Sequence, residues 1–150
     1  MTTAGAQSAD KKWVHVGPRD LLRSFDQHAA ESDRVSGTTA HLLLFYAVEC
    51  GLKGIALRLR KGRSTKDYPA EVRAAGHDLR EVAKHLRLPP QLRTHLAYPE
   101  CARRAASEPK VAPKQWHEAW RYGAILDAAD ETAAVHTLTE LRQWCKENAR

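Results

Sequence analysis

A nearly unbroken apolar segment occupies residues 38–59, where AHLLLFYAVECGLKGIALRL would be apolar on almost every side of a helix. Such a helix is stable only when other helices bury it. Glu49 and Lys53 lie inside this segment, four residues apart with the acid first, which is the favourable order for a helical ion pair. Because either charge buried alone would cost several kcal/mol, both need partners or a cleft. The segment therefore predicts a central buried helix, whose ion pair either orients its neighbours or belongs to a polar cleft or a dimer seam.

Further helices are expected around this central one, because apolar residues recur at helical spacing on both sides of it. Residue 78 should begin one helix and Asp130 should be the N-cap of the last one. Gly51 and Gly54 leave room on the central helix for the close approach of another backbone. The remaining expected helices are residues 18–33, 78–88, 114–127 and 131 onward, with a short turn at 91–96.

The chain is expected to be all-α, an up-and-down bundle of four to five helices, because no alternating strand pattern is visible. Residues 1–12 are small and polar and predict a disordered tail, which leaves residues 13–150 as one helical domain. Residues 98–113 contain prolines and scattered charges and predict a mobile surface loop.

Charge and cysteine usage narrow the class of partner. The formal net charge is +6 and the pI is about 9.4, which favours anionic partners such as nucleic acid, nucleotides or an acidic protein. Cys50, Cys101 and Cys145 lie far apart without a C-x-x-C pair, so neither a disulfide framework nor a zinc site is expected. We expect a cytoplasmic protein, since the start has no signal-peptide pattern and the longest apolar run, 42–48, is too short to span a membrane.

Three segments, FYAVECGLKGIAL, GHDLREVAKHL and QWHEAWRYG, occur in this order. Together they resemble HEPN domains, small helical bundles of prokaryotic toxins, phage-defence proteins and nucleotidyltransferase partners. The resemblance implies a homodimer that binds RNA, a nucleotide or a partner protein, such as a cognate antitoxin, near its cleft. No cofactor and no metal ion are expected, because no phosphate-binding, dinucleotide or zinc-ligand motif is present.

Active members of that family are metal-independent ribonucleases with an arginine followed, four to six residues later, by a histidine. After Arg121 the next histidine is His136, which is too far. Two pairs do match this spacing and are the candidate catalytic residues, Arg23 with His28 and Arg80 with His85. The two members of each pair are five residues apart, which is a turn of about 140° along a regular helix, so their side chains would point to different faces.

The candidate cleft residues come from the three segments that carry the resemblance. His77 either belongs to a helix cap with Asp78 or points toward Glu49 or Arg121, and a phosphate could rest at that helix start. Arg121 is favoured as a buried partner of Glu49 over a phosphate clamp. Trp116 and Trp120 fit a core better than a base-stacking platform. The complete candidate set is Glu49, Lys53, His77, Asp78, Arg121 and Tyr122.

A basic cluster follows the central helix and is either a solvated surface or a patch that grips a nucleic-acid backbone without reading sequence. Its members are Arg58, Arg60, Lys61, Arg63 and Lys66. The sequence thus supports three hypotheses. The first is a HEPN-like module that dimerises and binds RNA, a nucleotide or a protein in a toxin or phage-defence system. The alternatives are an active ribonuclease that needs no metal and a helical scaffold without a specific partner, so whether the chain is an enzyme stays open.

Overall fold

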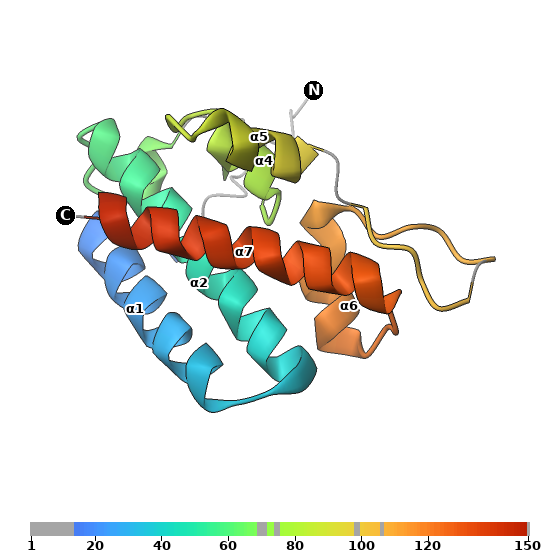
Figure 1. Cartoon of the computed structure of the whole chain (residues 1–150). Helices are drawn as coiled ribbons and strands as arrows, with labels where there is room; N and C mark the ends of the chain where they lie inside the picture. The colour runs from blue at the N-terminus through green and yellow to red at the C-terminus, as the bar shows by residue number, and fades with distance from the viewer. Residues whose placement is uncertain (1–13, 69–71, 74–75, 98–99, 106, 150) are drawn as a thin grey trace, which may run out of the picture.

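The computed structural model describes residues 14–68, 72–73, 76–97, 100–105 and 107–149. Within these ranges the chain is all-α, with six α-helices, two short 3₁₀ helices and no strand (Figure 1). This confirms the predicted fold class at that level, whereas the expected tail at residues 1–12 lies outside the described residues. The elements are α1 (Pro18–Arg34), α2 (Gly37–Leu59), η2 (Thr65–Asp67), α4 (Leu79–Ala83), α5 (Pro90–Ala97), η3 (Pro113–Gln115), α6 (Trp116–Tyr122) and α7 (Ala128–Asn148).

Helix α2 is the centre of the molecule, as the apolar segment predicted. It contacts α1, α4, α6 and α7, so other helices surround it on several sides. Phe45, Val48 and Leu52 on α2 are fully buried. The neighbouring helices remove the apolar side chains of α2 from water, and this burial is the main reason that α2 is stable here.

Two glycines let the neighbouring helices reach the backbone of α2. A Cβ atom added at Gly51 would lie 2.8 Å from Cys145 Sγ of α7 and 3.0 Å from Phe25 Cδ2 of α1. A Cβ atom added at Gly54 would lie 2.9 Å from Leu22 Cδ2 of α1. Both positions therefore serve the close approach that the sequence predicted.

Helices α2 and α7 run in the same direction. His41, near the start of α2, lies 3.9 Å from Glu131, near the start of α7. At their other ends, Arg58 donates a 2.7 Å hydrogen bond to the carbonyl of Ala149. Helices α1 and α2 are antiparallel, whereas α2 and α7 are parallel, as the second and fourth helices of an up-and-down bundle also are. The segment between α2 and α7 carries α4, α5 and α6 back across the molecule, as a crossover connection does (Figure 1).

Several predicted boundaries need correction near the C-terminal half. Helix α6 ends at Tyr122 rather than at residue 127, because Gly123 takes a left-handed conformation with φ of 78°. Helix α7 begins at Ala128, and its N-cap is Asp127, whose side chain accepts from the Asp130 amide. Asp130 is not the cap, since its carboxylate accepts from the Ala102 amide at 2.8 Å.

The middle of the chain also differs from the prediction. Helix α4 ends already at Ala83, and residues 91–96 belong to the eight-residue helix α5 rather than to a turn. The expected loop is attached to the body in its described part, because Cys101 is fully buried and the Ala102 amide donates to the Asp130 carboxylate at 2.8 Å. Arg103 also forms an isolated bridge with Leu126.

Candidate functional site

Glu49 and Lys53 form an ion pair that neighbouring elements enclose. The two side chains are 12% and 19% exposed, and Lys53 Nζ lies 3.7 Å from Glu49 Oε1. Lys53 also donates to the carbonyl of Gly76 at 2.9 Å, and its own carbonyl accepts from the Tyr68 hydroxyl. Both charges therefore have partners, as the sequence predicted.

His77 is the second partner of Glu49. Its Nδ1 lies 2.6 Å from Glu49 Oε2, while Asp78 caps α4 by accepting from the Arg80 amide at 3.1 Å. Both sequence interpretations of the His77–Asp78 pair thus hold, one for each residue. An ionised carboxylate can only accept, so this contact places the proton on Nδ1 and leaves Nε2 for another partner. The His77 side chain is 46% exposed, which makes this imidazole accessible.

His117, on α6, completes the site and was not among the predicted site residues. Its ring centroid lies 4.1 Å from that of His77, and it stacks on Phe45 with centroids 5.2 Å apart. Its side chain is 5% exposed, and its buried Nδ1 has no hydrogen-bond partner among the described atoms. Burial lowers the pKa of His117, and the neighbouring His77 acts in the same direction. This imidazole is therefore neutral at neutral pH.

One local signal could have found His117. It lies four residues before Arg121 in QWHEAWRYG, so both face one side of a helix. The Trp-rich stripe favoured a core interpretation of that segment, which is correct for Trp116 and Trp120, exposed by only 0% and 3%. Because the segment was interpreted as core, His117 was not considered a site residue, although its ring contacts that of His77, which lies 40 residues earlier in the chain.

Arg121 and Tyr122 do not reach the buried ion pair. Both are exposed, and the Arg121 Cζ atom lies 5.6 Å from the centroid of the Tyr122 ring. The prediction that Arg121 is the buried partner of Glu49 is wrong, because α6 ends at Tyr122 and its last turn lies at the surface. His77 takes the position beside Glu49 instead.

The candidates based on arginine and histidine spacing are not brought together as pairs. Arg23 is paired with Asp20, and Arg80 with Asp78. The His28 ring does approach the site from α1, since it lies 6.2 Å from Tyr46, whose ring is 6.5 Å from His77. His28 therefore extends the row of rings but not through its arginine.

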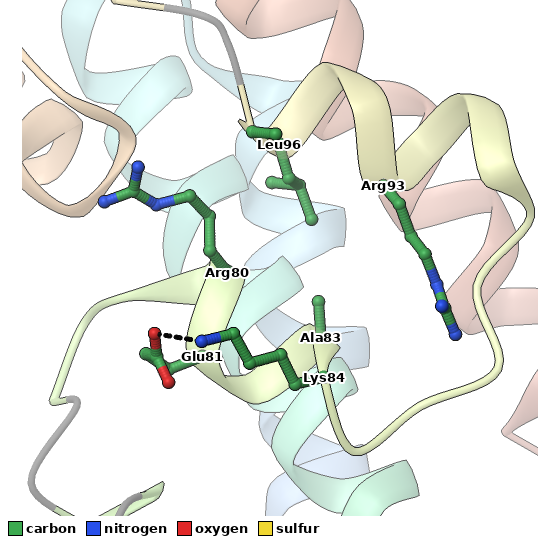
Figure 2. Close-up of a pocket in the computed structure, with 7 residues that line it drawn as sticks. Arg80, Glu81, Ala83, Lys84, Arg93 and Leu96 are labelled. Carbon is green, nitrogen blue, oxygen red and sulfur yellow. Dashed lines mark hydrogen bonds and ion pairs between the residues drawn. The ribbon is translucent and has the colours of Figure 1, made fainter.

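Arg80 also lines a groove of 470 Å³ between α4 and α5, together with Arg93, Lys84 and apolar side chains. Figure 2 shows the Arg80 and Arg93 guanidinium groups on opposite sides of Leu96, so they do not converge on one point. Lys84 is engaged with Glu81 at 2.7 Å, and Arg93 donates to the carbonyl of Leu86. His85, on the following turn, is partly buried and is not part of this lining.

The basic cluster lies at the end of α2 and in the turn that follows, and each of its five members is exposed. Asp67 accepts from the backbone amides of Arg63 and Ser64, and these hydrogen bonds hold the pKa of that carboxyl below its ordinary value. The turn is thus fixed by one carboxylate, and the cationic side chains remain at the surface.

The site contains side chains that can transfer protons. In the described ranges no group of three or more His, Cys, Asp and Glu side chains could hold a metal ion. Cys50, Cys101 and Cys145 are free thiols. None of the described helices is long and apolar enough to cross a membrane. An imidazole oriented by a carboxylate, with a second neutral imidazole beside it, can accept or donate a proton.

Comparison with known proteins gives no family for this chain. No family model matches the chain, and neither a curated protein nor a solved structure is detectably similar to it. The resemblance to HEPN domains therefore stays a prediction.

Proposed function

We propose that this chain is a HEPN-like helical module that binds RNA. The observation that carries this proposal is the basic cluster, five exposed Lys and Arg residues within residues 58–66, on a chain of net charge +6. Exposed cations gain affinity for nucleic acid by releasing the counterions of the phosphates. Homodimerisation and a role in a toxin or phage-defence system belong to the same proposal and rest on the resemblance alone.

One member of the basic cluster lies near the helix face that carries the ion pair, which supports a common ligand. Arg60, the C-cap of α2, follows Lys53 by seven residues, or about two helical turns, so it lies near the same side of the helix. The rise over seven residues is about 10 Å. A strand whose backbone contacts Arg60 would therefore extend toward Glu49 and His77.

The test is the salt dependence of binding to single-stranded RNA. We expect the triple variant of Arg58, Arg60 and Arg63 to Ser to bind more weakly at low salt. Its slope of log affinity against log salt should decrease by about 2, since each lost phosphate contact removes about 0.7 for a single strand.

A matched control removes three exposed cations elsewhere, by changing Arg87, Lys114 and Lys146 to Ser. This control has the same net charge as the first triple variant and should keep most of the affinity and slope. Equal losses in the two triple variants would show only diffuse attraction to a polyanion and would contradict the proposal.

A second function is favoured by one specific observation, the contact between the His77 and His117 rings at 4.1 Å with Glu49 behind His77. A ribonuclease that needs no metal requires a group that takes the proton of the attacking ribose hydroxyl and gives a proton to the departing 5′ oxygen as its bond to phosphorus breaks, and a cation at the phosphate. Accessible His77 supplies the first, and exposed Arg121 supplies the second.

Cleavage is tested by incubating RNA with the protein in EDTA. If this function holds, His77→Ala should lower the rate by about 100-fold or more, and Arg121→Ala should also lower it. His85→Ala serves as the control, because His85 is outside the site, and should leave the rate unchanged. No cleavage by the unmodified chain at high concentration would remove the ribonuclease candidate and leave RNA binding as the function.

A further inference from the structure

Tyr122 is an aromatic side chain at the surface that the fold does not use. It is 76% exposed, and it is the only Phe, Tyr or Trp among the exposed large hydrophobic residues of the described ranges. Gly123 ends α6 directly after it, with φ of 78°, and the Ala124 amide donates to the carbonyl of Ala119 at 2.9 Å. The backbone around Tyr122 is thus fixed while its ring is presented to solvent.

One cationic side chain lies over this ring and others line the hollow beside it, together with the acidic Glu118. Arg121 lies over it, with Cζ 5.6 Å from the ring centroid, which is within the range of a cation–π contact. The ring also borders a hollow of 420 Å³ whose lining includes Arg103, Lys110 and Glu118. Arg103 is paired with Glu108, and Lys110 is exposed.

The hollow has the size of a small-ligand site and one aromatic wall. Its lining also contains the apolar residues Val111, Ala119 and Ala124. Proteins that bind single-stranded nucleic acid combine such features, because bases stack on aromatic rings while cations follow the phosphates. Aromatic and cationic side chains together fit an RNA strand better than an apolar protein partner.

We propose that Tyr122 is a stacking platform for one base of single-stranded RNA, with Arg121 and Lys110 contacting the flanking phosphates. This inference rests on the proposed RNA binding and names the form of RNA that the surface accepts. Arg121 follows His117 by one helical turn, so a strand held here would pass beside the His77 and His117 rings.

The experiment uses the full chain and a single-stranded oligonucleotide that carries 2-aminopurine, whose fluorescence is quenched when it stacks on an aromatic ring. Tyr122→Ala should weaken binding by about 5-fold to 150-fold, the range for losing one stacked base, and should abolish the quenching. Tyr122→Phe keeps the ring and should retain both. Ile125→Ala is the matched control, because it removes a neighbouring exposed apolar side chain, and it should behave like the unmodified chain.

The outcomes separate this inference from the proposed function. If Tyr122→Ala binds and quenches like the unmodified chain, while the triple variant of the basic cluster loses affinity, the platform is refuted and RNA binding stands. If Tyr122→Leu keeps the full affinity of the unmodified chain while Tyr122→Ala loses it, the surface is an apolar docking site and the platform is refuted. If the unmodified chain binds no RNA at low salt, the proposed function itself is refuted.

Discussion

Replacing Glu49 by Gln should destabilise the fold measurably, although the two side chains have nearly the same size. The change removes the charge that His77 Nδ1 contacts at 2.6 Å and that Lys53 contacts at 3.7 Å. A hydrogen bond to a charged group contributes about 1.5–3 kcal/mol, and we take about 1.5 kcal/mol because the half-exposed His77 is screened by solvent. The longer ion pair with Lys53 adds less than about 1 kcal/mol. The expected loss in free energy of unfolding is therefore about 2 kcal/mol.

Urea unfolding followed by tryptophan fluorescence measures this loss. With a slope of about 2 kcal/mol per M, the midpoint should fall by about 1 M without a change in slope. Glu140→Gln is a matched control, because Glu140 also lies between two basic groups, His95 at 3.3 Å and His136 at 2.7 Å, both of which are more exposed than Lys53.

The control should change the free energy of unfolding by about 0.5 kcal/mol or less. Equally small losses of stability in Glu49→Gln and Glu140→Gln would contradict this prediction. In that case the enclosure of the ion pair by the segment at residues 76–78 would contribute nothing to the fold.

Three further predictions follow from burial. Gly51→Ala should lower stability by up to about 2 kcal/mol in urea unfolding, because overpacking against Cys145 and Phe25 costs about 1–3 kcal/mol and the gain in helix propensity offsets about 1 kcal/mol of it; a stabilised variant would contradict the packing described at Gly51. Burial raises the pKa of the Cys50 thiol to about 11 and that of Cys145 to about 12, so alkylation at neutral pH should be slow in the folded protein and fast in urea. The folded-state pKa of His117 lies below its ordinary value of 6.5, so the unfolded chain binds more protons in acid. The contribution of His117 to the free energy of unfolding should therefore be complete above pH 6.5 and decline as the pH falls toward the folded-state pKa. If the free energy of unfolding changed with pH in the same way in the unmodified chain and in His117→Gln, this prediction would be wrong.

The sequence was most informative where local and tertiary requirements agreed. Residues 18–33 and 38–59 were predicted almost to the residue, since Pro18 and the apolar pattern mark the helices and the surrounding core preserves them. Arg121 was favoured as the partner of Glu49 and this prediction was wrong, because the choice between His77 and Arg121 depends on where α6 ends. Local sequence could not decide this.

Other features depend on contacts between distant segments. Asp127 and Asp130 are equally suited to cap α7, and the contact of Asp130 with the Ala102 amide determines which one does. The direction of α7 relative to α2 likewise follows from the crossover, which periodicity does not reveal. His117 was missed because its role arises only when α6 is placed beside the start of α4.

The central claim is that neighbouring elements close around the charges of α2 and place His117, neutral and buried, against His77. Nitrogen-15 NMR of the imidazole rings during a pH titration tests it most directly. We expect a His77 Nδ1–H in contact with Glu49, and a His117 whose pKa lies below 6.5, the ordinary value of a histidine. A His117 ring that titrates like a free, solvent-exposed histidine would contradict the account.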